Sequence, residues 1–288
     1  MRKLIFISLI VSLISNEVFS QSNLLNAKNP SEIGVSSSMD KINPTFLEYP
    51  EIDEKDILWS KVVYEYIDLN EKLNFPLLFP VNDEQYTETR KSLWKIIREN
   101  IENGTIDEVF DVRNDNFLEN NRITGRTKIM DFYGSKYTPG DSRPQTFAQS
   151  SDITGYRIKG VWYFDKLHSE MKYRLLGIQP YGRNLKEFGK EQGYFWIWYP
   201  SIREILAKHE VFNDKNNNNR ISFDDLLVNR RFSSFIYKYD NVYGDREIAD
   251  YIQKRPGESN KQHQLRIILE SERIKKEILD FELDMWGY

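Results

Sequence analysis

YRIKGVWYFDKLHSEMKYRLLGI, residues 156–178, is the stretch of the chain that decides the fold class. It holds two runs rich in aromatic and aliphatic residues, separated by the connection LHSE at 167–170. Such runs around a short turn are typical of two antiparallel strands joined in a hairpin. A third strand is predicted at 194–199, where the sequence reads YFWIWY. The middle of the chain therefore predicts a small antiparallel sheet, arranged as a meander.

Helical periodicity appears on the N-terminal side of this sheet. Asp53 can cap a helix whose apolar residues recur at helical spacing as far as Leu69. A second helix is expected over 83–103, with Gly104 well placed at its C-terminal end. A short strand is expected within 105–112, before the chain becomes polar.

Further helices are predicted after the sheet. Three short ones are expected at 202–212, 224–237 and 245–253. The last is long, from about Lys261 to Trp286, and its apolar stripe comprises Ile267, Ile274, Ile278, Phe281 and Met285. This order predicts an α+β fold, in which N-terminal and C-terminal helices flank the sheet and the C-terminal helix is long.

The first twenty residues have the composition of a cleavable export signal. Arg2 and Lys3 precede an almost wholly apolar run at 4–14, and an acceptable cleavage site follows Ser20. The run is shorter than the roughly 20 residues that a membrane-spanning helix needs. An uncleaved anchor or a buried helix is the alternative interpretation. We expect a signal peptide at 1–20, and no membrane span in the rest of the chain.

The remaining chain is expected to form one domain with an extended arm before it. Residues 21–52 lack periodicity and are rich in Ser, Asn and Pro, which predicts an extended N-terminal arm. Residues 53–288 are expected to be a single α+β domain. Within it, 113–154 is polar and punctuated by Gly and Pro, which predicts a flexible insertion. The arm and the insertion are candidate partner-binding segments.

Composition excludes several classes of function. Of the 288 residues 40% are hydrophobic, enough for a folded core, and the net charge is -4. A mildly acidic chain offers no electrostatic basis for binding nucleic acid. The chain has no cysteine, which excludes disulfides, thiolate catalysis, thiolate zinc sites and a cysteine-linked lipid anchor.

One segment can be aligned with a calcium-binding EF-hand loop. In DKNNNNRISFDD, Asp214 to Asp225, oxygen-bearing side chains fall at loop positions one, three, five, nine and twelve. Only Asp214 and Asp225 bring charge to ligand positions, and Lys215 and Arg220 stand in the same loop. The alternative is an Asn-rich turn before a helix that starts near Ser222, with Asp225 completing a capping box.

No catalytic or metal-binding signature emerges. His168, His209 and His263 lack metal-ligand spacing, and the sequence has no nucleophile elbow, phosphate-binding loop or H-E-x-x-H. A pair of carboxylates acting on cell-wall polymers stays an alternative that sequence cannot test. The aromatic run at 194–199 could offer an open platform for carbohydrate, or could be buried on both faces. We therefore assign no catalytic, cofactor or metal residue.

Several phrases together resemble one protein family. They are DEKDILWSKVV at 53–63, IDLNEKLN at 67–74, IKGVWYFDK at 158–166, YRLLGI at 173–178, ISFDDLL at 221–227, RRFSSFIYK at 230–238, NVYGDR at 241–246 and FELDMW at 281–286. In this order they resemble the gliding-motility family GldN, which is called PorN in non-gliding relatives. The resemblance extends from Asp53 to the end of the chain, and 21–52 and 113–154 match more loosely.

The resemblance implies a non-enzymatic role. Members of that family are periplasmic parts of the type IX secretion system, associated with the inner face of the outer membrane. They form a ring-like complex with a lipoprotein, GldK or PorK, and contact the inner-membrane motor protein GldM or PorM. The family implies the same partners here, self-association in a ring, and no cofactor. A periplasmic calcium- or carbohydrate-binding module is the alternative.

Overall fold

The protein is described here from a computed structural model. The residues that the structure describes are 49–84, 91–113, 115–136, 145–187, 189–211 and 221–286. All of them belong to one compact unit, Pro44–Tyr288. The expected signal peptide and nearly all of the expected arm lie outside the described residues. Within the described part of the chain, no helix combines the length and the apolar character that crossing a membrane requires.

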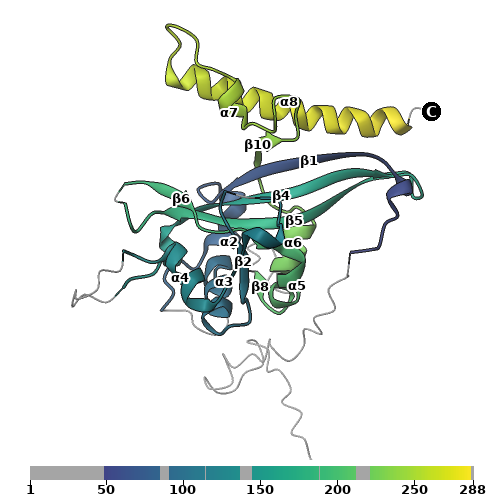
Figure 1. The fold of residues 1–288 in the computed structure, drawn as a ribbon. Coiled ribbons are helices and arrows are strands. Elements are labelled where there is room, and N and C mark those ends of the chain that lie inside the picture. The colour runs from purple at the N-terminus through teal and green to yellow at the C-terminus, as the bar shows by residue number, and fades with distance from the viewer. Residues whose placement is uncertain are drawn as a thin grey trace, which may run out of the picture. The chain divides into compact units, whose positions relative to one another are not determined.

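One antiparallel sheet forms the centre of this unit (Figure 1). Its long strands are β1 (Ile57–Asp68), β4 (Ile153–Asp165) and β5 (Glu170–Arg183). Its short strands are β6 (Glu191–Gly193), β7 (Ile197–Trp198) and β10 (Phe235–Tyr239). The strand order is β10-β1-β4-β5-β6, and β7 also pairs with β5. An α+β fold with a curled antiparallel sheet and a long C-terminal helix is therefore confirmed.

The predicted hairpin is the pair β4 and β5. Trp162 lies opposite Tyr173, and Asp165 lies opposite Glu170 at the turn. The prediction succeeded here because both strands carry aromatic and aliphatic side chains and a short turn separates them. The hairpin contains the longest strand pairing in the sheet, and the neighbouring strands run along it.

The helix predicted from Asp53 to Leu69 is wrong, because these residues form a short 3-10 turn, η3 (Glu54–Asp56), followed by strand β1. β1 lies between β10 and β4, and it pairs with both. Val63 and Tyr64 point to opposite faces, yet both are buried. Because both faces of β1 are covered, polar and apolar residues do not alternate, and the strand period is hidden.

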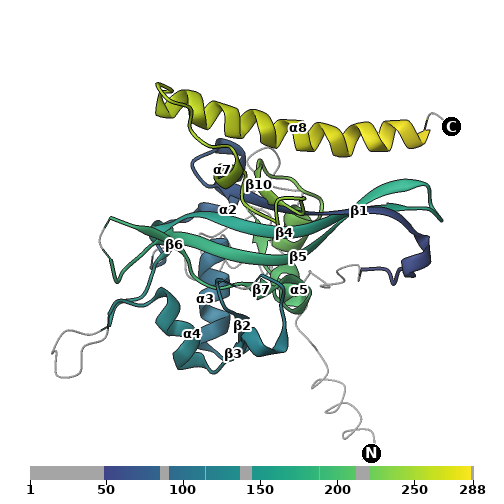
Figure 2. The ribbon, with the colours of Figure 1, turned by 45° about the horizontal axis from the view of Figure 1, so that its top comes forward.

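The main core lies on one side of the sheet, where short helices cover it (Figures 1 and 2). These helices are α2 (Phe75–Leu78), α3 (Leu93–Glu102), α4 (Arg126–Tyr133), α5 (Tyr199–Ala207) and α6 (Phe223–Val228). Two small ribbons accompany them, β2 (Glu108–Phe110) with β3 (Arg122–Thr124), and β8 (Glu210–Val211) with β9 (Ile221–Ser222). Further 3-10 turns are η4 (Lys72–Asn74), η5 (Glu119–Asn121) and η6 (Ser150–Asp152).

The two C-terminal helices lie on the other side of the sheet in both ribbon views. They are α7 (Ile248–Tyr251) and α8 (Asn260–Trp286), which has 27 residues. Ile274 and Ile278 of α8 are buried in a second cluster with Val63, Ile236 and Ile248. The long helix and the centre of its inner stripe agree with the sequence prediction.

Several predicted boundaries need correction. The strand expected at 194–199 is reduced to the two residues of β7, because Tyr199 already begins α5. The helix expected at 224–237 ends at Val228, since Arg230 adopts a left-handed conformation with a φ of 52° and the chain turns into β10. The helix expected at 202–212 ends at Ala207, and β8 follows it.

Residues 113–154 contain regular structure that sequence analysis did not anticipate. β3 and α4 lie within this segment, and Ile129 and Tyr133 of α4 are buried in the main core. Asp115 forms an ion pair with Lys238 of β10, with the charged atoms 2.7 Å apart. The described part of the segment is thus attached to the domain through α4 and Asp115.

Candidate interaction surfaces

The middle of α8 is fixed to the sheet by polar contacts as well as apolar ones. The backbone N–H of Ile236 donates a hydrogen bond to Oγ of the buried Ser271 at 2.8 Å. Lys275 Nζ donates to the backbone oxygen of Ser234 at 2.7 Å. These bonds join α8 to β10 and its preceding loop, and they determine which side of the helix faces the sheet.

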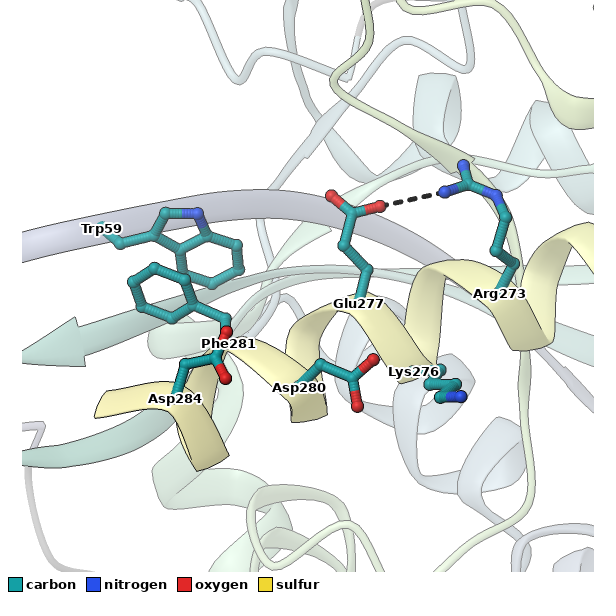
Figure 3. Close-up of a pocket in the computed structure, with 7 residues that line it drawn as sticks. All are labelled: Trp59, Arg273, Lys276, Glu277, Asp280, Phe281 and Asp284. Atoms are coloured by element: carbon teal, nitrogen blue, oxygen red, sulfur yellow. Dashed lines mark hydrogen bonds and ion pairs between the residues drawn. The ribbon is translucent and has the colours of Figure 1, made fainter. Parts of the chain in front are cut away.

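The C-terminal half of α8 is held by an aromatic stack, which Figure 3 shows, and by an ion pair. Trp59 of β1 stacks on Phe281 with ring centroids 4.7 Å apart, and Phe164 meets the same Phe281 edge-on at 6.2 Å. Lys61 and Glu277 form an ion pair at 2.6 Å, and the hydrogen bond from Lys61 lowers the pKa of Glu277. Both contacts connect the first strand with the last helix.

A groove of about 430 Å³ lies between α8 and β1. Its lining residues are Trp59, Arg273, Lys276, Glu277, Asp280, Phe281 and Asp284. In Figure 3 the stacked rings lie at one end and the carboxylates of Asp280 and Asp284 line the helix beside them. Arg273 is engaged by Glu270 and Glu277, at 2.8 and 3.2 Å. Within the described part of the chain, Asp280, Asp284 and Lys276 have no ion-pair partner, so the groove carries two unpaired carboxylates and one unpaired ammonium group.

A second groove, of about 810 Å³, lies beside the β4–β5 turn. Its lining residues are Pro50, Glu51, Ile52, Asp53, Asp56, Asp165, Leu167, His168, Lys172 and Arg174. Trp59 of the first groove lies opposite Phe164 of β4, and Asp165 of the second groove directly follows Phe164, so both grooves lie towards the same end of the sheet. This end of the sheet thus carries two grooves that are lined by several carboxylates.

Asp165 is the most strongly held carboxylate of the second groove. It accepts hydrogen bonds from Lys172 Nζ at 2.7 Å and from the backbone N–H of Leu167 at 2.9 Å, and His168 Nδ1 lies 2.7 Å away. The hydrogen bond from Lys172 holds the pKa of Asp165 well below its usual range. A carboxylate ionised so firmly is a poor proton acceptor near neutral pH, so Asp165 stabilises the turn and is not suited to acid–base catalysis.

The end of the N-terminal arm is attached to β5. Arg174 Nη2 donates to the backbone oxygen of Pro50 at 2.5 Å, and the Tyr49 hydroxyl donates to the backbone oxygen of Leu175 at 3.3 Å. The guanidinium groups of Arg174 and Arg203 lie 5.0 and 4.2 Å from the Tyr49 ring centre. Burial raises the pKa of Tyr49 to about 12. The arm therefore leaves the domain beside the second groove.

Two buried ion pairs are structural in character. Asp224 accepts two hydrogen bonds from Arg203, at 3.0 and 2.9 Å, and one from the Tyr199 hydroxyl at 2.8 Å. Glu65 accepts two from Arg230, at 2.9 and 2.7 Å. Each carboxylate is saturated by an arginine within the protein, which is the arrangement a buried charge requires. Neither is available to a substrate.

The three histidines, which lack metal-ligand spacing in the sequence, lie on three separate elements. His168 is in the β4–β5 turn, His209 follows α5, and His263 is in the first turn of α8, where its Nε2 lies 2.6 Å from the backbone oxygen of Ile252. Burial lowers the pKa of His209. Across the described ranges, the structure brings together no group of three His, Asp or Glu side chains that could hold a metal ion.

Most of the candidate calcium loop lies outside the described residues, since 212–220 are not among them. At its end the capping-box interpretation is confirmed. The backbone N–H of Asp225 donates to Ser222 Oγ at 3.0 Å, and the backbone N–H of Ser222 donates to Asp225 Oδ2 at 3.3 Å. The charge expected at loop position twelve is thus used to begin α6.

The aromatic run at 194–199 is part of the core and not a carbohydrate platform. Tyr194, Trp196 and Tyr199 are at most 3% exposed, and the intervening Phe195 and Ile197 are fully buried. Trp198 is half-buried against Phe117, with ring centroids 5.0 Å apart. Both faces of the run are covered, so an open aromatic platform is excluded here.

A family model described as "Gliding motility associated protein GldN" matches residues 52–287 of the chain. The chain belongs to the GldN family. The match covers every described residue from Ile52 onward, including α8, the first groove and all of the second groove except Pro50 and Glu51. Membership makes the chain a component of the gliding-motility and type IX secretion apparatus, as its resemblance to the family had indicated. A search of curated proteins finds no match.

No local pattern in the sequence indicates the two grooves. The pattern around Trp59 predicts a helix, and its stacking partner Phe281 is predicted only as part of the inner stripe of α8. Their contact joins distant parts of the chain through the sheet, so no local pattern could signal it. The exposed leucines of α8 were also passed over, although their spacing is visible in the sequence.

Proposed function

We propose that the chain is a periplasmic scaffold subunit of the type IX secretion and gliding-motility machinery. It is exported with a cleavable signal peptide and works at the inner face of the outer membrane. There it forms a ring-like complex with a lipoprotein of the GldK or PorK kind, and contacts the motor protein of the GldM or PorM kind. The observation that carries this proposal is the family match across residues 52–287.

The surface chemistry supports a role in protein binding. The described carboxylates whose pKa values are lowered are engaged by lysine or arginine partners within the protein, as Asp165 is by Lys172. Large apolar side chains are exposed on several elements, including Leu73, Leu118 and Leu283 at 52–60%. Exposed apolar side chains and grooves lined by carboxylates are suited to contacts with other proteins.

The arm and the segment 113–154 are the proposed docking elements for the lipoprotein. The arm leaves the domain at Tyr49 and Pro50, where β5 holds it. In the segment, Leu118 is 52% exposed and neighbours the ion-paired Asp115. Deleting the whole segment would remove Ile129 and Tyr133 from the core, so surface substitutions are the sharper test.

The test measures binding of the purified chain to the purified lipoprotein and to the periplasmic part of the motor protein. Deletion of residues 21–48 and the substitution Leu118→Lys should each weaken lipoprotein binding about tenfold, the loss of one well-packed contact. The matched control is Leu73→Lys, because Leu73 is 60% exposed and lies outside both segments. Equal binding by all variants would overturn the assignment of these segments.

A further inference from the structure

The outer side of α8 carries a regular stripe that nothing in the described part of the chain covers. Leu265, Leu269, Leu279 and Leu283 are 55, 58, 53 and 60% exposed. Glu272 and Lys276, also exposed, lie between the two leucine pairs. In an α-helix, residues two positions apart point about 200° away from each other. The stripe therefore lies opposite Ile274, which is buried against the sheet, and so on the side of the helix that faces away from the sheet.

The spacing of this stripe is that of a coiled-coil seam. From Leu265 to Leu283 the six positions follow one another in steps of four, three, four, three and four residues. This is the alternation of a and d positions in a heptad repeat, which presents one narrow face to a partner helix. The inner stripe centred on Ile274 already serves the domain core. α8 thus has a second face that is patterned for another helix.

The order of residues along the stripe is symmetric about Ile274. Leu265 and Leu283 lie equally far from it, as do Leu269 and Leu279, and so do Glu272 and Lys276. If a second copy of α8 runs antiparallel across a two-fold axis at Ile274, leucine meets leucine in the outer layers. In the central layers Glu272 of each copy meets Lys276 of its partner. Antiparallel pairing also brings each a position opposite a d position, which is the normal layer of such pairs.

One flank of the stripe carries charges of both signs. Arg266 lies on it in the N-terminal half, Arg273 near the centre, and Asp280 and Asp284 in the C-terminal half. Antiparallel pairing places Arg266 of one copy beside Asp280 and Asp284 of the other, while Glu258 of its own chain also holds Arg266 at 3.0 Å. The two Arg273 side chains then come together near the axis, where Glu270 and Glu277 of each chain balance their charge. The choice of direction therefore depends on the central layers. Parallel pairing would instead set Glu272 against Glu272 and Lys276 against Lys276, which is unfavourable.

We propose that two copies of this chain associate through the outer faces of their α8 helices, as an antiparallel pair around Ile274. The sheets then lie on opposite sides of the helix pair, because each α8 contacts its own sheet through the other face. A two-fold contact of this kind closes on itself. It leaves the grooves' β-strand walls and the segment 113–154 free, and it requires neither the lipoprotein nor the motor protein, so it goes beyond the proposed ring.

Charge exchange tests the central layers. Glu272→Lys makes two lysines face each other, and Lys276→Glu makes two glutamates face each other, so each should raise the dimer dissociation constant about tenfold. The double variant restores opposite charges and should restore dimerisation. Glu272 also forms an exposed ion pair with Lys275 within its own helix, so thermal unfolding is measured for each variant to separate folding from association. The readout is mass by light scattering or sedimentation of the purified protein alone.

Engineered cysteines test the direction of pairing, because the chain has no cysteine of its own. In the double variant Leu269→Cys/Leu279→Cys, the cysteine at 269 of each copy faces the cysteine at 279 of the other copy. Oxidation should therefore link 269 to 279. In Leu269→Cys alone, the two cysteines lie about 15 Å apart along the helices and cannot join. Dimers that show these two results support the proposal. A monomer at about 100 µM, a 269-to-269 link, or no restoration in the charge-exchanged double variant would overturn it.

Discussion

Trp59 and Phe281 stack with ring centroids 4.7 Å apart and planes inclined by 19°, and so attach the last turns of α8 to the first strand of the sheet. Phe281→Ala should destabilise the protein by about 1–2 kcal/mol, because Phe281 is only partly buried. Amide hydrogen exchange should accelerate most in the C-terminal turns of α8. The matched control is Leu283→Ala, measured at a dilution that keeps the chain monomeric, since Leu283 points outward. Equal effects of both substitutions would contradict the role of the stack.

The pair Arg203 and Asp224 should be far more important for stability than an exposed pair on the same helix. Asp224→Asn leaves a charged guanidinium buried without its counter-charge, and should lower the free energy of unfolding by about 3–5 kcal/mol. Glu204→Gln breaks an exposed ion pair with Lys208, in which the side chains of Glu204 and Lys208 are 65 and 53% exposed, and should leave stability nearly unchanged. Urea denaturation measures both. A loss below about 1 kcal/mol in Asp224→Asn would refute the argument.

Asp165 should make the stability of the β4–β5 turn depend on pH. Its pKa is lower in the folded protein than the value near 3.9 of an unfolded chain. Its contribution is therefore complete above that value and is lost as the pH falls towards the folded pKa. Asp165→Asn should be less stable than the parent by about 1–3 kcal/mol at pH 7, and the difference should shrink between pH 4 and pH 2. A difference that stays constant over this range would contradict the assignment.

Asp53→Asn is the matched control for this pH profile. Asp53 pairs with Lys55 at 2.6 Å, but their side chains are 67 and 77% exposed. Breaking so exposed a pair should change stability by less than about 1 kcal/mol at any pH.

Calcium should not stabilise the protein. Asp225 is engaged by Ser222 as a helix cap, and the loop before it carries Lys215 and Arg220, which repel a cation. Thermal unfolding in about 1 mM calcium, the weak end of the affinity range for such loops, should match unfolding in a chelator. A rise in the melting temperature that Asp214→Asn abolishes would restore the calcium-binding interpretation.

Local patterns sufficed for two parts of the fold. The hairpin at 156–178 combines strand-forming residues with a short turn, and the last helix, of 27 residues, carries its inner stripe from Ile267 to Met285. Such signals are long and lie within one segment, so they can be recognised without knowledge of tertiary contacts. The capping box at Ser222 and Asp225 was predictable for the same reason, because both partners lie within four residues.

Strand β1 and the two grooves depend on contacts between distant parts of the chain, which sequence patterns do not show. Val63, Glu65 and Ile67 of β1 are all buried, and the charge of Glu65 is balanced by Arg230, which reaches it from a loop far along the chain. A buried glutamate in a strand covered on both faces gives no alternation to detect. The two grooves are likewise assembled from the first strand, the hairpin turn and the last helix, and they exist only after the sheet has formed.

A chain that works by binding other proteins should be recovered from the cell together with them. The tagged protein is purified from periplasmic and outer-membrane fractions at native expression and low salt, and the proteins that accompany it are identified and quantified by mass spectrometry. The account predicts a lipoprotein in stoichiometric amount together with the motor protein. Recovery of the chain without either partner, under conditions in which its fold is intact, would contradict it.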